Sequence, residues 1–176
     1  MKKAPIITVL VILAAVLVGV GIYLGTKKDT NKLTSTNQAT TASTPKQLDL
    51  NAVLSNLQKQ FPTIQQTYVY SEQRDPNHNL GKSGYYVAGA EFYDGRTNTT
   101  PDGYAFGTDS GGAIEVYSNS SDAAKRIAYL QQFQGQAALD PGAFKQVGKI
   151  VIRASTNYTK SQQDEVIIYI ASQVNR

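Results

Sequence analysis

An uncharged apolar run near the start of the chain is the feature that most limits what this sequence can form. Residues 4–24 lie between two lysine pairs and consist almost entirely of Ile, Val, Leu, Ala and Gly. A helix of this length reaches about 31 Å, which matches the ~30 Å hydrocarbon core of a bilayer. We therefore predict a transmembrane signal-anchor over residues 1–25, with residues 4–24 in contact with the lipid bilayer. The alternative is a cleaved signal peptide, but its apolar run is normally about 7–15 residues and ends at a small-x-small site, and no Ala-x-Ala signal follows here.

The net charge of +4 belongs to the flanks of this segment. Residues 1–44 hold five Lys and one Asp, whereas residues 45–176 are balanced, with 12 basic and 12 acidic side chains. The basic pI therefore reflects membrane topology, and we expect no nucleic-acid partner. Lysines flank the apolar run on both sides, so the positive-inside rule hardly favours one orientation of the segment in the membrane over the other. The polar domain that follows favours a single-pass protein of the cell membrane with a cytoplasmic N-terminus and an extracytoplasmic C-terminal domain. Gly21 and Gly25 form a small-xxx-small pair that could support a homodimer, although Gly is common in spanning helices.

Two further zones follow the apolar run. Residues 26–47 are rich in Thr and Ser and contain too little apolar surface to offset chain entropy, so they are predicted to be a disordered linker. Residues 48–176 hold all five Phe and ten of the eleven Tyr, which predicts a single extracellular domain with its own core.

Periodicity in residues 48–176 predicts an α+β fold. A helical apolar stripe runs from Leu50 to Phe61 and can be capped by Asp49. Strands are predicted at 67–72, 84–93, 113–117 and 148–154, a second helix after Asn119 or Ser120, and a third after a capping box that begins at Thr159. The order α-β-β-β-α-β-α indicates a four-stranded, mainly antiparallel sheet with helices packed on one face. In the strand at 84–93, alternation places Tyr86 with Ala88, Ala90 and Phe92 on the face toward the helices.

The opposite face of this sheet carries the candidate ligand-binding residues. They combine tyrosines with charged side chains, and tyrosine offers a rigid apolar ring with a polar tip. The alternative is a solvated face on which these side chains form stabilising cross-strand pairs. The eight residues are Tyr68, Tyr70, Tyr85, Glu91, Tyr93, Glu115, Tyr117 and Arg153.

The sequence indicates no catalytic, metal or cofactor site. It contains no Cys, which excludes thiol nucleophiles, thiolate metal sites, disulfides and lipid-modified cysteines. Residues 108–112, Thr-Asp-Ser-Gly-Gly, resemble the nucleophile segment of trypsin-like proteases, but His78 is the only possible base and lies outside that family's His motif. We therefore interpret Ser110 as part of a turn. Likewise, Asp75 is expected to form an Asx turn around Pro76 rather than a cation site.

Five spaced motifs resemble a group of uncharacterised exported proteins and lipoproteins of Gram-positive-type bacteria. They are Ser-Glu-x-x-Asp-Pro-Asn-x-x-Leu-Gly-x-x-x-Tyr at 71–85, Gly-Gly-Ala-Ile-Glu-Val-Tyr at 111–117, Asp-Ala-x-x-Arg-x-x-Tyr-Leu at 122–130, Ile-Val-Ile-Arg at 150–153 and Thr-Lys-Ser-Gln at 159–162. The resemblance covers about residues 68–173 and implies a location in the cell envelope, but it implies no activity. The chain departs from the group because it lacks the lipobox cysteine.

Together these observations predict a membrane-anchored binding module of the bacterial cell envelope, not an enzyme, with an envelope protein or glycan as its partner. Two alternatives remain. A hydrolase acting on envelope polymers would use Glu91 and Glu115 as its carboxylate pair, which requires both in one cleft. The other alternative is an assembly partner of another membrane protein.

Overall fold

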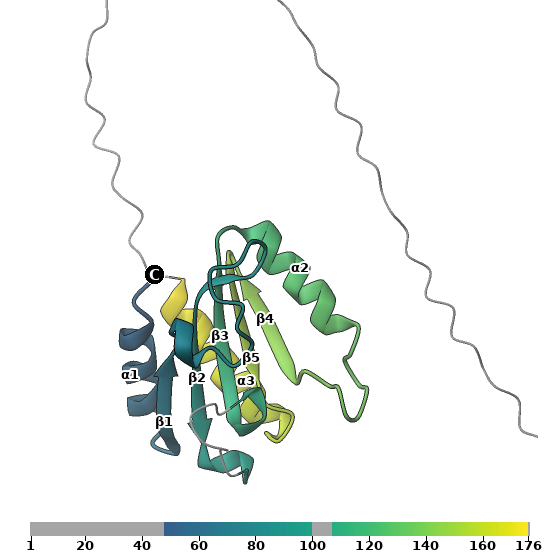
Figure 1. The fold of residues 1–176 in the computed structure, drawn as a ribbon. Helices are drawn as coiled ribbons and strands as arrows, with labels where there is room; N and C mark the ends of the chain where they lie inside the picture. The colour runs from purple at the N-terminus through teal and green to yellow at the C-terminus, as the bar shows by residue number, and fades with distance from the viewer. Residues whose placement is uncertain (1–47, 100–106, 176) are drawn as a thin grey trace, which may run out of the picture. The chain divides into compact units, whose positions relative to one another are not determined.

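A computed structural model describes residues 48–99 and 107–175 (Figure 1). The predicted membrane anchor over residues 4–24, its Gly21/Gly25 pair and the linker over residues 26–47 lie outside the described residues. Within the two described ranges, no helix is long and apolar enough to cross a membrane. In chain order the elements are α1 Leu50–Gln60, β1 Ile64–Val69, η1 Glu72–Arg74, β2 Tyr86–Asp94, η2 Gly95–Thr97, η3 Thr108–Ser110, β3 Gly111–Tyr117, α2 Ser120–Gln131, β4 Ala143–Val147, β5 Ile150–Ala154 and α3 Lys160–Val174.

The five strands form one antiparallel sheet in the order β1-β2-β3-β5-β4. This confirms the predicted α+β class and the antiparallel sheet, but the prediction of four strands is wrong because it omits β4. In the β4–β5 hairpin, Val147 pairs with Ile150 across Gly148 and Lys149. Gly148 has a φ of +56°, which the first position of a two-residue type II′ loop requires. In the sequence, the sign of this hairpin is thus the Gly-Lys pair. The strand β4 beside it is too short to show a clear alternation of apolar and polar residues.

One face of the sheet carries an aliphatic core beneath α1 and α3. The predicted caps of both helices are confirmed: Asp49 Oδ1 accepts the backbone N–H of Ala52 at 3.1 Å, and Thr159 and Gln162 form a capping box. The buried members of this core are Leu50, Val53, Leu54, Leu57, Phe61, Ile64, Ala90, Phe92, Ile114, Val116, Ile150, Ile152, Ala154, Tyr158, Val166, Ile167 and Ile170.

Helix α2 packs on the opposite face, so the prediction that helices cover only one face is wrong. Asn119 caps this helix as expected, since its Oδ1 accepts the N–H of Asp122 at 2.9 Å. The physical reason for the error is that tyrosine can line either a wet surface or a core, because its ring buries apolar area while its hydroxyl needs one partner. The buried cluster on this face consists of Tyr68, Tyr70, Tyr86, Tyr117, Ala123, Leu130 and Val151.

A bulge in β2 moves Tyr86 to this second face. The register of the β2–β3 pair shifts between Tyr86 and Ala88, and the intervening Val87 is exposed. Ala90 and Phe92 lie in the aliphatic core as predicted, whereas Tyr86 lies in the tyrosine cluster. The prediction for Tyr86 was wrong because one extra residue reverses the alternation of a strand.

Candidate functional site

The eight residues predicted to form a binding face do not lie on an open surface. Five are buried: Tyr68, Tyr70, Glu91, Glu115 and Tyr117. Tyr93 and Arg153 are partly buried, and Tyr85 is 48% exposed. The expectation of a solvated face is therefore wrong, because α2 and the segment that contains Leu80 pack against it. That these residues bind a ligand stays a prediction.

Four tyrosines from three neighbouring strands form a row of rings beneath this covering layer. The ring centroids are 5.8 Å apart for Tyr68 and Tyr70, 5.5 Å for Tyr70 and Tyr86, and 6.5 Å for Tyr86 and Tyr117. These spacings fall in the range of favourable aromatic pairs. A Cβ placed on Gly89 would lie 2.3 Å from the ring of Tyr70, so the row needs glycine at that position.

Three of these tyrosine hydroxyls donate to buried carboxylates. Tyr70 donates to Glu91 Oε1 at 2.8 Å, and Tyr117 donates to Glu115 Oε2 at 2.7 Å. Tyr86 donates to Asp75. Burial, together with the nearby carboxylates, raises the pKa of Tyr70, Tyr86 and Tyr117. These hydroxyls are therefore neutral hydrogen-bond donors at physiological pH.

Glu115 is the centre of a buried ion cluster. Its side chain accepts Nε–H and Nη2–H of Arg126, both at 2.9 Å, in a bidentate pair. Nη1 of Arg153 lies 3.5 Å from Glu115 Oε1. Burial alone would lower the pKa of Arg126, but the hydrogen bonds to Glu115 outweigh burial and raise it. Both carboxylate oxygens of Glu115 are thus occupied by protein donors.

Asp75 organises the segment that faces α2. Its Oδ1 accepts the N–H of Asn77 at 3.1 Å, and its Oδ2 accepts the N–H of Asn79 and, at 2.7 Å, that of Leu80. Burial alone would raise the pKa of Asp75, but the hydrogen bonds from Tyr86 and these amides outweigh burial and lower it. The predicted Asx turn is confirmed, and it fixes the backbone from which Asn77 and Asn79 project.

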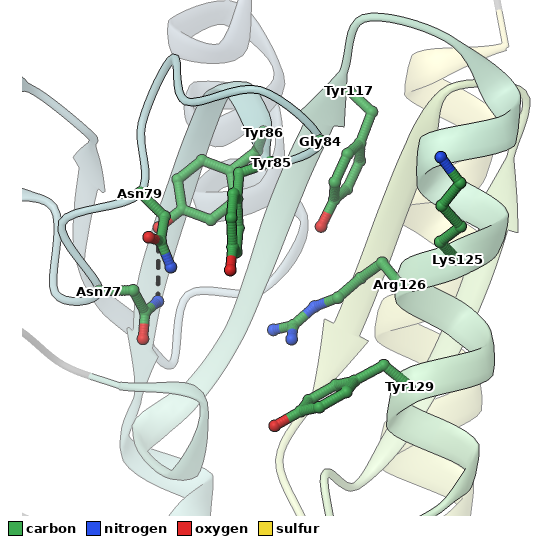
Figure 2. A pocket seen from close by; sticks show the side chains of 9 residues that line it. All are labelled: Asn77, Asn79, Gly84, Tyr85, Tyr86, Tyr117, Lys125, Arg126 and Tyr129. Carbon is green, nitrogen blue, oxygen red and sulfur yellow. Dashed lines mark hydrogen bonds between the residues drawn. The ribbon is translucent and has the colours of Figure 1, made fainter. Parts of the chain in front are cut away.

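A cleft of about 390 Å³ lies between this segment and α2 (Figure 2). Tyr85 and Tyr129 are its most exposed aromatic residues, at 48% and 51%. Figure 2 shows the hydroxyl of Tyr85 and the guanidinium of Arg126 directed into the gap from opposite sides. The volume is within the range of small-molecule sites. The cleft is lined by Asn77, Asn79, Gly84, Tyr85, Tyr86, Tyr117, Lys125, Arg126 and Tyr129.

A second, smaller cleft of about 240 Å³ adjoins the first and shares two lining residues with it, Arg126 and Tyr129. The ring of Tyr129 lies 5.1 Å from that of Phe133, which also lines the second cleft. The two clefts therefore meet at one arginine and one tyrosine of α2. The remaining lining residues are Leu130, Phe133, Ala138, Leu139, Asp140, Pro141 and Arg153.

The two carboxylates of the hydrolase alternative share a sheet face but line neither cleft. In the β2–β3 pairing, Glu91 is opposite Ala113 and Glu115 is opposite Gly89, so the two glutamates are diagonal neighbours. Both are buried, and Glu115 is held by Arg126. This arrangement gives no support to the hydrolase alternative, which stays a prediction.

The other chemical motifs of the sequence also occupy structural positions. Ser110 is buried at the end of η3, whereas His78 is exposed in the loop after Asp75. Asp94 is buried and bonded to Arg96. In residues 48–99 and 107–175, no group of three or more His, Cys, Asp or Glu could hold a metal ion.

Only two of the nine residues that line the first cleft, Tyr85 and Tyr117, were predicted as binding residues. The lining residues that α2 supplies to the cleft, above all Arg126 and Tyr129, were not predicted from the sequence. Their spacing of three residues places them on one side of a helix, which was an available signal. This spacing did not lead to a predicted site, because α2 was expected to pack on the sheet face opposite the tyrosines.

Comparison of the chain with protein-family models, with curated proteins and with solved structures finds no match. The resemblance to exported proteins and lipoproteins of Gram-positive-type bacteria therefore stays a prediction.

Proposed function

We propose that this protein is a binding module, that its ligand site is the cleft between residues 75–86 and α2, and that its ligand is a short glycan. The observation that carries the proposal is the pair of half-exposed tyrosines, Tyr85 and Tyr129, which border a cleft otherwise lined mainly by hydrogen-bonding groups.

The chemistry of the lining favours a sugar. A sugar ring offers a C–H face that packs on an aromatic ring and a rim of hydroxyls that need donors and acceptors. The exposed rings supply the first contact. The amides of Asn77 and Asn79, the amine of Lys125 and the guanidinium of Arg126 supply the second.

The surface around the cleft favours a small ligand over a protein partner. A stable protein interface covers roughly 800 Å² on each partner and contains a continuous apolar centre. Besides the two tyrosines, the large exposed apolar side chains of the described residues are Val87, Leu139 and Ile168, which lie on a strand, a loop and the helix α3. The assembly-partner alternative therefore has no specific observation in its favour.

The placement of the module in the cell envelope is part of the same proposal. It is supported by the apolar run at residues 4–24 and by the polar composition of residues 26–47. In this proposal the lipid bilayer holds the N-terminal segment, and the glycan site lies on the extracytoplasmic side.

The experiment is a calorimetric titration of the full-length chain with cellotetraose and with the tetramer of N-acetylglucosamine. We expect binding of at least one, and Tyr85→Ala and Tyr129→Ala should each raise its Kd about tenfold, the equivalent of about 1.4 kcal/mol. Ile168→Ala is the matched control, because it removes an even more exposed apolar side chain, 63% accessible, from α3. The proposal is wrong if neither glycan binds, or if the two tyrosine variants bind as the control does.

A further inference from the structure

Arg153 is a partly buried cation whose hydrogen-bonding groups are only partly satisfied by the described residues. Its side chain is 15% exposed. Among the described residues, its Nε has no hydrogen-bond partner. Its closest carboxylate oxygen, Glu115 Oε1, is 3.5 Å away and already accepts from Arg126. Among the described residues, Arg153 therefore has one ion-pair contact, at 3.5 Å, and an Nε–H without an acceptor.

Such an arrangement is costly unless another group completes it. A buried donor without an acceptor has lost its hydrogen bonds to water and gained none in the protein, and the loss is larger when the group is charged. Arg96 shows what this chain does with an arginine in a purely structural position: it donates to Asp94 at 2.7 and 2.9 Å and to Glu165 at 3.0 Å. Within residues 48–99 and 107–175, Arg153 has no comparable set of bonds, and it lines the second cleft.

Arg126 presents further donors at the same place. Its Nε–H and one Nη2–H are bound to Glu115, and it lines both clefts. Its Nη1 and the second N–H of Nη2 do not take part in the pair with Glu115. Two guanidinium groups with remaining donors form the fork geometry that binds carboxylate and phosphate oxygens.

We infer that the second cleft is an oxyanion subsite in which Arg153 and Arg126 bind a carboxylate or phosphate carried by the glycan. The inference rests on the proposed function, because it assumes that a sugar ring occupies the first cleft. It narrows the ligand class to acidic glycans, in which a ring on Tyr85 and Tyr129 is followed by a charged substituent near Arg153.

The acidic residues around the subsite are compatible with this assignment. Asp140 is the carboxylate among the lining residues of the second cleft, and its two oxygens accept the N–H groups of Gly135 and Gly142, both at 2.9 Å. Asp140 is thereby bonded to its own loop. Glu91 is buried on β2 and accepts from Tyr70. Phe133 and Leu139 supply apolar contacts beside the arginines in the same cleft.

The experiment compares three probes that share one backbone: cellotetraose, the tetramer of glucuronate with the same linkage, and cellotetraose 6-phosphate. Each is titrated into the full-length chain by calorimetry, while ¹⁵N NMR follows the Nε–H signal of Arg153. We expect at least one acidic probe to bind about tenfold more tightly than cellotetraose and to shift that signal. The acidic probe that binds more tightly identifies the anion as carboxylate or phosphate.

Arg153→Met should bind the acidic probe no more tightly than it binds cellotetraose. Lys59→Met is the matched control, because it removes the same charge from the exposed side of α1, over the other sheet face. If Arg153→Met does not fold, Arg153→Lys is the second variant, because it keeps the positive charge but lacks the forked N–H donors of a guanidinium. It should lose most of the preference for the acidic probe over cellotetraose.

The outcomes separate this inference from the proposed function. If the neutral and acidic probes bind equally and Tyr85→Ala weakens the binding of both, the oxyanion subsite is wrong and the glycan site stands. If no oligosaccharide binds but inorganic phosphate shifts the Arg153 signal, the subsite stands and the glycan site fails. If no probe binds and phosphate leaves the Arg153 signal unchanged, both are wrong.

Discussion

The two faces of the sheet bury their side chains in different ways. The face beneath α1 and α3 is filled mainly by Leu, Ile, Val and Ala, whereas the α2 face is filled by tyrosines and by the carboxylates of Glu91 and Glu115. Both clefts described above lie on the α2 face. An aliphatic face is stabilised by close packing alone, while a tyrosine face must also satisfy hydroxyls and charges. On the α2 face, buried polar groups therefore lie next to the two clefts.

Two ion clusters sharpen the contrast. Near the end of β2, one arginine, Arg96, is shared by two carboxylates, Asp94 and Glu165. On the α2 face, one carboxylate, Glu115, is shared by two arginines. In the first cluster all three nitrogens of Arg96 donate to carboxylates, whereas in the second the Nε of Arg153 has no hydrogen-bond partner among the described residues. The difference is the physical basis for expecting a ligand anion on the α2 face.

The largest expected effect is that of removing the charge of Glu115. Glu115→Gln leaves Arg126 and Arg153 without their shared carboxylate and should lower the free energy of unfolding by about 3–5 kcal/mol. In the aliphatic face, Ile152→Val removes one methylene from a fully buried side chain and should cost about 0.5–1.5 kcal/mol. Urea unfolding of both variants measures the difference. A smaller loss in Glu115→Gln than in Ile152→Val would show that the ion cluster contributes little to stability.

A hydroxyl deletion tests the buried tyrosine row. Tyr117→Phe removes the donor to Glu115 Oε2, and it should cost about 1.5–3 kcal/mol because the acceptor is charged and buried. Tyr85→Phe is the control, since Tyr85 is 48% exposed and its hydroxyl can be hydrated. Thermal unfolding should separate the two variants clearly. Equal melting temperatures would contradict the distinction between buried and exposed tyrosines.

Acid should weaken the domain through Asp75 and Asp94. Burial alone would raise the pKa of each carboxyl, but hydrogen bonds outweigh burial and lower it in the folded state. The folded pKa lies below the unfolded pKa, so the stabilisation is present above the unfolded value of about 3.9 and is lost as the pH falls through the folded value. Each pKa unit of difference is worth about 1.4 kcal/mol.

Unfolding free energies between pH 6 and pH 2 measure this dependence. Asp75→Asn should make the curve shallower and should also speed hydrogen exchange at the amides of Asn79 and Leu80, which donate to Asp75. An unchanged curve in Asp75→Asn would show that this carboxyl does not carry the acid sensitivity.

The smallest expected effect on stability is at the rim of the cleft. Tyr129→Ala removes a half-exposed ring whose neighbours include Phe133, and it should change the free energy of unfolding by no more than about 0.5 kcal/mol. The same variant is predicted to weaken glycan binding. A large loss of stability would mean that Tyr129 belongs to the packing of α2 and not to a ligand site.

The local elements of the fold were predictable because their signals lie within one segment. The apolar stripe of α1, the Asn119 cap and the Thr159–Gln162 capping box all depend on residues within about four positions of each other, and all are confirmed. The bulge at Val87 and the strand β4 were not predictable in this way. Each depends on how a strand pairs with its neighbour.

The tyrosines, asparagines and arginine of the candidate site are visible in the sequence, but nothing in the sequence shows that they lie together in one cleft. The sequence by itself determined the α+β class, the starts of the helices and the concentration of ten of the eleven tyrosines in residues 48–176. Only the tertiary structure decided which tyrosines are buried and which line a cleft, because α2 packs on the tyrosine face and brings Arg126 and Tyr129 opposite Tyr85. Side-chain burial is set by contacts between distant segments, and the period of a single segment shows which residues share a face without showing what covers that face.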